Sequence, residues 1–295
     1  MQNILANIHE SNQQSRAWLF LGWTILYIGI FVFLGVFSEG DPDAILTMDS
    51  TSLMILQGVS AGIFFLLLPF LFWRYALKLK IQDTFQRFDL VTLGYTVLLS
   101  IAAMVVISAI GVWNLSLDLP DSAFEQWAQA KEAELKILTD HLIDFTSTGQ
   151  FLLAIVVIGV IPAVGEELLF RGLIQNFISK ISNNHHAGIW ISAILFSAIH
   201  LQFYGFFPRV LLGVLFGYLY VWSGRLSVAM LAHFLNNSIA LTLAYVASSG
   251  LVEVSTDELE QAAPWQLVLF FLAIGGFALY KFKNHFKNEQ LAEGI

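Results

Sequence analysis

Six polar side chains that could take part in chemistry occur in three strongly apolar stretches of this sequence. They are Glu166, Glu167, Arg171, His200, His233 and Asn237. Ionisable residues are costly to place at membrane depth, so each one there points to a functional site. A carboxylate, imidazoles and a carboxamide are the groups needed to hydrolyse an amide bond with an activated water molecule.

Helical spacing separates the roles of the two adjacent glutamates. Glu167 and Arg171 are four residues apart, so they share a helix face and can form an ion pair. Glu166 is turned by about 100° from Glu167 and lacks that partner. We therefore expect Glu167 to be an orienting carboxylate and Glu166 to carry the chemistry. Pro162 and Gly165 precede the pair and could let the helix backbone bend around a site.

The same spacing places His233 and Asn237 on one face of another helix, with Asn236 rotated away. Each of these residues also has a purely structural explanation, because a membrane Glu near an Arg can be a packing ion pair and a His can be a core residue. Three separate apolar stretches each bear a desolvation cost, however, which favours one shared polar site.

Composition indicates that lipid is the solvent of this chain. Of its 295 residues, 57% are hydrophobic and 12% are charged, against about 25% charged residues in soluble domains, and the mean hydropathy is +0.71. The 14 Lys and Arg do not exceed the 22 Asp and Glu, so no nucleic-acid partner is expected. The chain has no cysteine, which excludes disulfides, Cys-ligated metals and a thiol nucleophile.

Apolar runs of about 20 residues predict an all-α, polytopic membrane protein. The eight expected spans are 17–37, 52–73, 90–112, 150–170, 187–203, 206–222, 227–248 and 264–281. Most Lys and Arg then fall on the side of the N-terminus, which predicts that both termini are cytoplasmic. The polar first residues lack the pattern of a signal peptide, so we expect the first span to be retained.

The chain divides into four parts on this basis. We expect a cytoplasmic tail at 1–16, three transmembrane helices and an outer amphipathic segment (114–149) within 17–149, a catalytic core at 150–248, and an outer loop, last helix and basic tail at 249–295. In segment 114–149, Asp121 and Ser122 are candidate helix caps. Leu135, Leu138, Leu142 and Phe145 repeat on one helical face. This helix either lies on the outer membrane surface or against the bundle, or it gates substrate.

Three ordered motifs resemble a known family. Glu166-Glu167-x-x-x-Arg171, Phe196-x-x-x-His200 and His233-x-x-x-Asn237 together are similar to the CAAX protease and bacteriocin-processing (CPBP, or Abi) family of intramembrane proteases. The resemblance covers roughly residues 150–245. Each motif alone is weak, whereas the ordered set at membrane depth is specific.

The resemblance implies peptide-bond hydrolysis inside the membrane, on membrane-associated or lipidated peptides. It implies that Glu166 is the base, that His200 is its partner, and that His233 and Asn237 donate to the oxyanion. Glu167 and Arg171 would shape the site and Phe196 would pack it. The implied partners are membrane lipids and a peptide or protein substrate, and the expected location is the bacterial plasma membrane.

Other hypotheses stay open at this point. Glu166, His200 and His233 could instead form a three-ligand zinc site, but the His-Glu-x-x-His pattern is absent, so we favour a metal-free mechanism without a cofactor. The chain could also be an ion-coupled transporter, although no inverted repeat is evident, or a non-catalytic scaffold or immunity protein.

Overall fold

The computed structural model describes residues 22, 47–76, 87–117, 119–249 and 263–292, and every regular element among these residues is a helix. An all-α fold is therefore confirmed. The predicted span at 17–37 lies outside the described residues except for Gly22. The elements are α4 (Ser50–Ala61), η1 (Gly62–Leu67), α5 (Leu68–Leu71), η2 (Phe72–Ala76), α6 (Leu90–Leu115), α7 (Ala123–Ile143), α8 (Thr148–Ala154), η4 (Ile155–Val160), α9 (Ile161–Glu167), η5 (Leu168–Gln175), α10 (Asn176–Ser182), α11 (His185–Ala198), α12 (Phe206–Ser223), α13 (Leu226–Ser248) and α15 (Trp265–Ala292).

Six helical stretches in the described part of the chain are long and apolar enough to cross a membrane. They are Ser50–Leu71, Leu90–Leu115, Thr148–Ser182, Phe206–Ser223, Leu226–Ser248 and Trp265–Asn288. The protein is thus a polytopic membrane protein, as predicted. The number of eight spans, the orientation of the termini and the domain boundaries stay predictions.

The helix that carries both glutamates is longer than predicted. It runs over the 35 residues Thr148–Ser182, whereas the hydropathy pattern indicated 150–170. The π-helical segments η4 and η5 flank α9, and wide turns of this kind are frequent at functional sites. The apolar pattern breaks at Arg171, but that side chain and those of Gln175 and Asn176 are buried and hydrogen-bonded, so the helix continues through them.

The predicted span at 187–203 is wrong at its end. Helix α11 stops at Ala198 after 14 residues, about 21 Å at 1.5 Å per residue, which is short of the roughly 30 Å hydrocarbon core. Leu201 adopts a left-handed conformation with φ of 56°, which a right-handed helix does not continue through. His200 therefore lies in a turn between α11 and α12.

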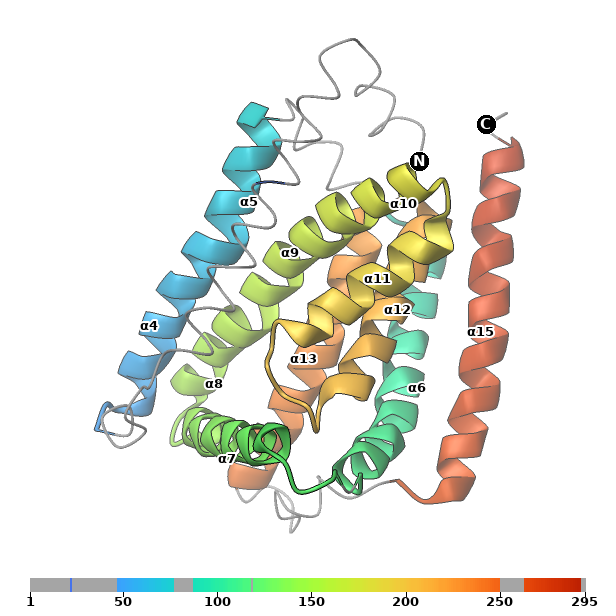
Figure 1. Ribbon diagram of the computed structural model, residues 1–295. Helices are drawn as coiled ribbons and strands as arrows, with labels where there is room; N and C mark the ends of the chain where they lie inside the picture. Colours follow the sequence, from blue (N-terminus) through green and yellow to red (C-terminus); the bar gives the residue numbers. More distant parts are fainter. Residues whose placement is uncertain (1–21, 23–46, 77–86, 118, 250–262, 293–295) are drawn as a thin grey trace.

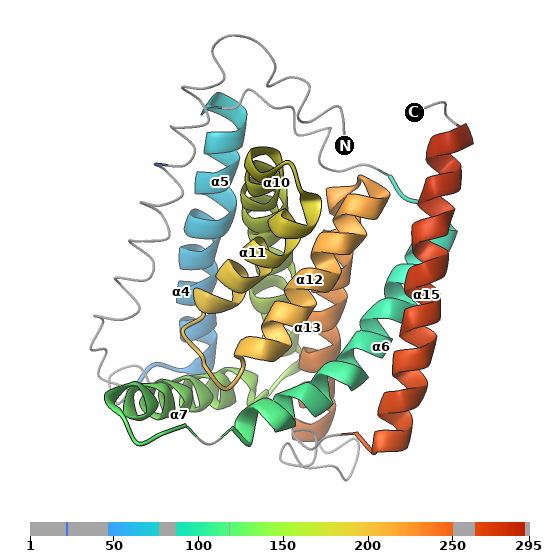
Figure 2. The same cartoon turned by 45° about the vertical axis from the view of Figure 1, so that its right-hand side comes forward.

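The long helix α8–α10 runs obliquely through the middle of the molecule, and α11, α12 and α13 pack around it (Figures 1 and 2). Helix α6 lies between this group and α15. Close packing of α11 on α12 depends on two glycines, because a Cβ at Gly213 or Gly217 would lie 2.9 Å from Ala193 Cβ or Ile189 Cγ2. Such small-residue contacts let helix backbones approach in lipid.

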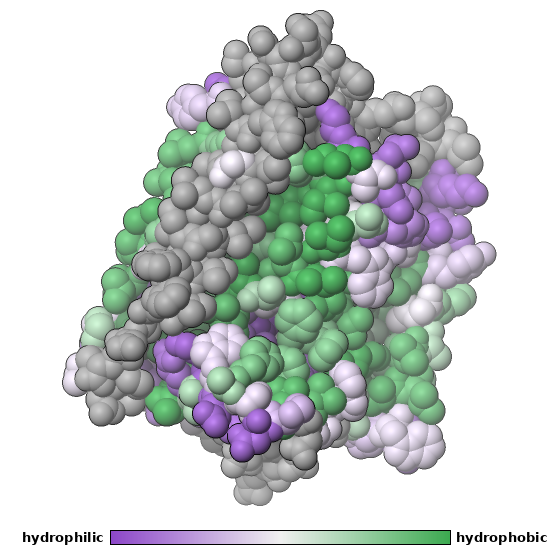
Figure 3. All heavy atoms as spheres, in the orientation of Figure 1, coloured by the Kyte–Doolittle hydropathy of each residue, from purple (hydrophilic) through white to green (hydrophobic). Residues whose placement is uncertain are grey.

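Helix α7 lies across one end of the bundle (Figures 1 and 2). Its cap is Ser122, whose Oγ accepts a hydrogen bond from Glu125 N at 3.2 Å. Leu142 and Phe145, at and just beyond its end, are buried in a cluster with Leu53 of α4. Hydrophilic side chains lie along the outside of α7, whereas the face of the bundle above it is mostly hydrophobic (Figure 3). A helix is thus present within the predicted segment 114–149, over Ala123–Ile143, and its role and its side of the membrane stay predictions.

Candidate active site

A fully buried ion pair forms the centre of the site. Arg171 Nη1 donates to Glu167 Oε1 at 2.8 Å, and neither residue has any exposed surface. Arg171 Nη2 donates to the carbonyl oxygen of Gly213 at 3.0 Å. The guanidinium carbon also lies 4.7 Å from the ring centroid of Phe196 and 5.4 Å from that of Phe216. The pairing expected from the four-residue spacing is present, and aromatic faces stabilise the cation.

Glu167 also holds His233. The Nδ1 atom of His233 lies 3.0 Å from Glu167 Oε1, and a carboxylate paired with Arg171 only accepts hydrogen bonds. The proton is therefore assigned to Nδ1, which turns Nε2 toward the rest of the site. The imidazole ring stacks on Phe216 with centroids 5.1 Å apart and an interplanar angle of 19°.

Glu166 faces the other nitrogen of the same imidazole. Its Oε2 lies 3.9 Å from His233 Nε2, and only 7% of the residue is exposed. The adjacent glutamates thus have different environments, because Glu167 is neutralised by Arg171 whereas Glu166 is directed at an imidazole across a gap. Their roughly 100° separation on the helix produces this division.

His200 is placed by the turn that follows α11. Its Nδ1 lies 2.8 Å from the carbonyl oxygen of Phe196, and a carbonyl only accepts, so Nδ1 carries the proton and Nε2 can accept. The ring of Phe196 contacts both imidazoles, with centroid distances of 5.2 Å to His200 and 5.9 Å to His233. In the described part of the chain, no hydrogen bond joins His200 to Glu166.

Asn237 lies one turn after His233, and its carboxamide is oriented from both ends. Its Nδ2 donates to the carbonyl oxygen of Ile158 at 3.0 Å, and its Oδ1 accepts from Asn236 Nδ2 at 3.2 Å. Asn236 thus contacts Asn237, and the expectation that it is rotated away on the helix stays a prediction. One N–H of Asn237 Nδ2 is not used by the bond to Ile158.

The donor set for zinc does not fit this arrangement. Among the described residues, no group of three or more His, Cys, Asp or Glu side chains could hold a metal ion. Zinc binds its ligand atoms at about 2.0–2.2 Å from the metal, so His233 Nε2 and Glu166 Oε2, which are 3.9 Å apart, could reach one ion, but the described residues do not bring a third ligand to them. The alternative set of Glu166, His200 and His233 is therefore not assembled, and we derive no step through a metal.

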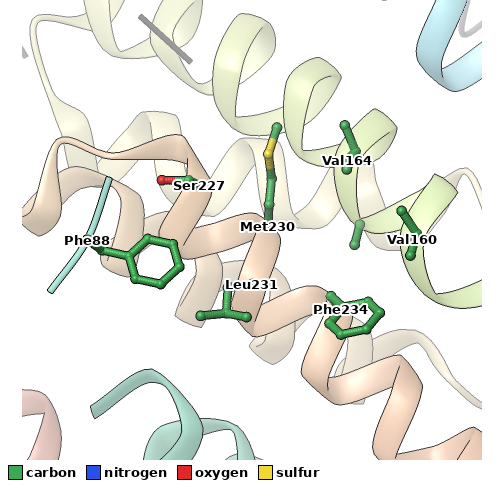
Figure 4. A pocket seen from close by; sticks show the side chains of 8 residues that line it. Phe88, Val160, Val164, Ser227, Met230, Leu231 and Phe234 are labelled. Carbon is green, nitrogen blue, oxygen red and sulfur yellow. The ribbon is translucent and has the colours of Figure 1, made fainter. Parts of the chain in front are cut away.

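An apolar hollow of about 280 Å³ lies between α9 and α13 (Figure 4). On α13, Met230 and Phe234 flank His233 in sequence, and on α9, Val164 precedes Glu166 by two residues. The hollow therefore lies against the two helices that carry the site. Its lining consists of Phe88, Val160, Ala163, Val164, Ser227, Met230, Leu231 and Phe234.

Sequence reasoning assigned no role to Arg209, which is the fourth residue of the predicted span at 206–222. This residue lies in the first turn of α12, and its Nη2 donates to Gln202 Oε1 at 2.6 Å. Coulomb interactions couple its guanidinium to Glu166 and His200. The available signal was Arg209 itself, a cation within four residues of the start of an apolar run.

Residues 148–239 match a protein-family model described as "Type II CAAX prenyl endopeptidase Rce1-like". The uncharacterised protein YpbD of Bacillus subtilis is 28% identical over 120 residues, which are 37% of this chain and 59% of YpbD. The aligned part thus spans little more than half the length of that relative. No solved structure matches the chain. The resemblance indicated by the three motifs is confirmed for the segment that contains them.

Proposed function

We propose that this chain, similar over residues 148–239 to Rce1-like CAAX endopeptidases, is an intramembrane endopeptidase that uses Glu166 to activate water. Its substrates would be membrane-associated or lipidated peptides. The observation that carries the proposal is the division between the glutamates: Glu167 binds Arg171 and His233, while Glu166 faces His233 Nε2 at 3.9 Å. A buried carboxylate without its own guanidinium is suited to take a proton.

In this mechanism, a water molecule beside Glu166 loses a proton to that carboxylate as its oxygen attacks the carbonyl carbon of the peptide bond. His200 accepts a hydrogen bond from the same water through Nε2. The carbonyl oxygen becomes an oxyanion, to which His233 Nε2–H and the remaining N–H of Asn237 donate. Glu166 then transfers the proton to the leaving amine, so that one water is consumed and an acid and an amine are released.

The mechanism uses both ring nitrogens of His233 as donors. To donate through Nε2 while Nδ1–H binds Glu167, the imidazole must carry a positive charge. Glu167 stabilises this charge as the orienting carboxylate does in a hydrolase triad. The proposal needs no metal and no cofactor, and it places the protein in the bacterial plasma membrane with lipids and peptides as partners.

The direct test is Glu166→Gln in the purified, detergent-solubilised full-length protein. Peptides released from a library of lipidated and unlipidated membrane peptides are identified by mass spectrometry. We expect the rate to fall by roughly 10²–10⁴-fold, since that is the usual contribution of a general base. Asp140→Asn, on the exposed face of α7, is the matched loss of one carboxylate and should leave the rate unchanged.

Two results would count against the proposal. Cleavage by Glu166→Gln at the wild-type rate would exclude Glu166 as the base. Loss of activity in a chelator, with recovery on addition of zinc, would overturn the metal-free mechanism but not the assignment as a protease.

A further inference from the structure

Arg209 is partly buried, and its guanidinium is only partly hydrogen-bonded. Its Nη2 donates to Gln202 Oε1 at 2.6 Å, whereas Nη1 is shielded from solvent and has no hydrogen-bond partner among the described residues. Leaving a buried charged donor unsatisfied is costly. The atom therefore suits an acceptor that the described part of the chain does not supply.

Arg209 lies near the candidate active site and α7. It binds Gln202, which is two residues after His200, and it is one helical turn before Gly213, the acceptor for Arg171. Its charge interacts with Glu166 and with Glu132 of α7. The turn before α12 touches α7 directly, since the rings of Phe203 and Phe124 pack edge to face at 5.6 Å. A small hydrophilic patch is visible in the recess above α7 within the otherwise hydrophobic face (Figure 3). Arg209 is thus a cation near enough to Glu166 for the two charges to interact.

The position of this guanidinium depends on the backbone beside it. A Cβ at Gly205 would collide with Arg209 Nη2, so a side chain there would displace the end of the arginine. Gly205 has φ of −109°, a conformation that alanine also adopts. The effect of a side chain at this position is therefore steric and falls on the guanidinium.

Glu132 of α7 interacts with Arg209 by charge. Its Oε2 is also buried without a hydrogen-bond partner among the described residues. The two groups compensate each other's charge without a close ion pair between them, so α7 supplies no acceptor to Nη1.

We propose that Arg209 binds a carboxylate of the peptide substrate beside the scissile bond. This inference rests on the proposed function and deepens it, because it assigns a specificity residue to the same site. A planar guanidinium with an unused donor suits a carboxylate, which accepts in a bidentate manner. In a peptide the carboxylate comes from the C-terminus or from an Asp or Glu side chain, and the test separates these sources.

The experiment measures binding in the Glu166→Gln background, so that it does not depend on hydrolysis. The probes are a fluorescein-labelled Leu-Val-Leu-Leu peptide with a free C-terminal carboxylate, its C-terminal amide, and the amide with Glu in place of Val. Fluorescence anisotropy in detergent gives Kd, with protein-free micelles as the blank. We expect one of the carboxylate peptides to bind about 10–100-fold more tightly than the neutral amide, as a charge-assisted hydrogen bond contributes.

Four further variants distinguish a binding role from a structural one. Arg209→Gln should abolish the preference for the carboxylate peptide. Gly205→Ala should also abolish it, although the charge of Arg209 is kept, and Arg209→Lys should retain part of it. Glu132→Gln should strengthen the preference, because it removes the competing carboxylate. If Arg209→Gln fails to fold, Gly205→Ala and Arg209→Lys answer the same question.

The outcomes separate this inference from the proposed function. A preference for the free C-terminus supports a terminal carboxylate, and a preference for the Glu-containing amide supports an acidic side chain. Equal binding of all three probes, or a preference that survives Arg209→Gln, overturns the inference. The binding preference could depend on Arg209 while cleavage does not need Glu166. That pair of results would overturn only the proposed function.

Discussion

Replacing Arg171 with Met tests whether the buried ion pair organises the site. The change keeps an unbranched, flexible side chain, although a shorter one, and removes the donor to Glu167 Oε1 and to the Gly213 carbonyl. Removing one partner of a buried pair costs about 3–5 kcal/mol, because the other charge is left uncompensated. One kcal/mol shifts Tm by about 2–4 °C in a domain of this size class, so we expect Tm to fall by roughly 6–20 °C.

A double-mutant cycle identifies the cause of this loss. Glu167→Gln alone leaves Arg171 buried with the Gly213 carbonyl and two aromatic faces, so it should also be strongly destabilising. The double variant Glu167→Gln/Arg171→Met buries no charge at this position. Its Tm should therefore lie well above the value expected from adding the two single losses, as coupled sites show.

Tryptophan fluorescence during heating of the detergent-solubilised protein reports Tm for the four proteins of the cycle. The control is Asp140→Asn, which breaks a pair with Lys136 at 3.5 Å in which both side chains are about half exposed. Exposed pairs contribute little to stability, so this variant should melt close to the wild type. Losses in the double variant equal to the sum of the single losses would refute the reasoning, because the two charges would then be acting independently.

Two further predictions concern packing and pH. A Cβ at Gly165 would lie 2.5 Å from the backbone oxygen of Phe65, so Gly165→Ala should separate α9 from η1, lower Tm and reduce peptide cleavage. A Cβ at Gly62 would meet nothing within 4 Å, so Gly62→Ala should leave Tm and cleavage unchanged. Equal Tm values for the two variants would contradict this prediction. Burial raises the pKa of Glu132 despite the nearby charge of Arg209. Ionising this group therefore costs more in the folded than in the unfolded state, so Glu132→Gln should raise Tm above the folded pKa and lose that gain as pH falls below the unfolded value near 4.5. A gain in Tm that is the same at pH 4 and pH 8 would show that Glu132 does not titrate as described.

The parts of the site that follow helical periodicity could be predicted from the sequence. The pair of Glu167 and Arg171 depends only on a spacing of four residues within one helix, and the structure shows it at 2.8 Å. The cap at Ser122 is likewise local, because its hydroxyl bonds to a backbone N–H three residues later. Interactions within one turn are set by helix geometry, which a sequence pattern reports directly.

The parts that depend on chain reversals could not be predicted. Nothing in the apolar run up to His200 indicates that α11 ends at Ala198 or that Leu201 takes a left-handed conformation. The bond from His200 Nδ1 to the Phe196 carbonyl exists only because of that ending. Hydropathy describes how long a segment is apolar, and it contains no information on where its backbone turns.

Arg209 shows why the cations of such a chain cannot all be assigned by topology. The sequence pattern places it at the start of the predicted span at 206–222 and does not indicate where its side chain lies. In the structure its guanidinium binds Gln202 and occupies the space that Gly205 leaves. Because Glu166 lies within its electrostatic range, the charge acts on the site and not only on the orientation of the loop. Gly205→Ala is therefore the sharper variant, since it moves the charge without removing it, and a loss of carboxylate preference would show that position is what matters.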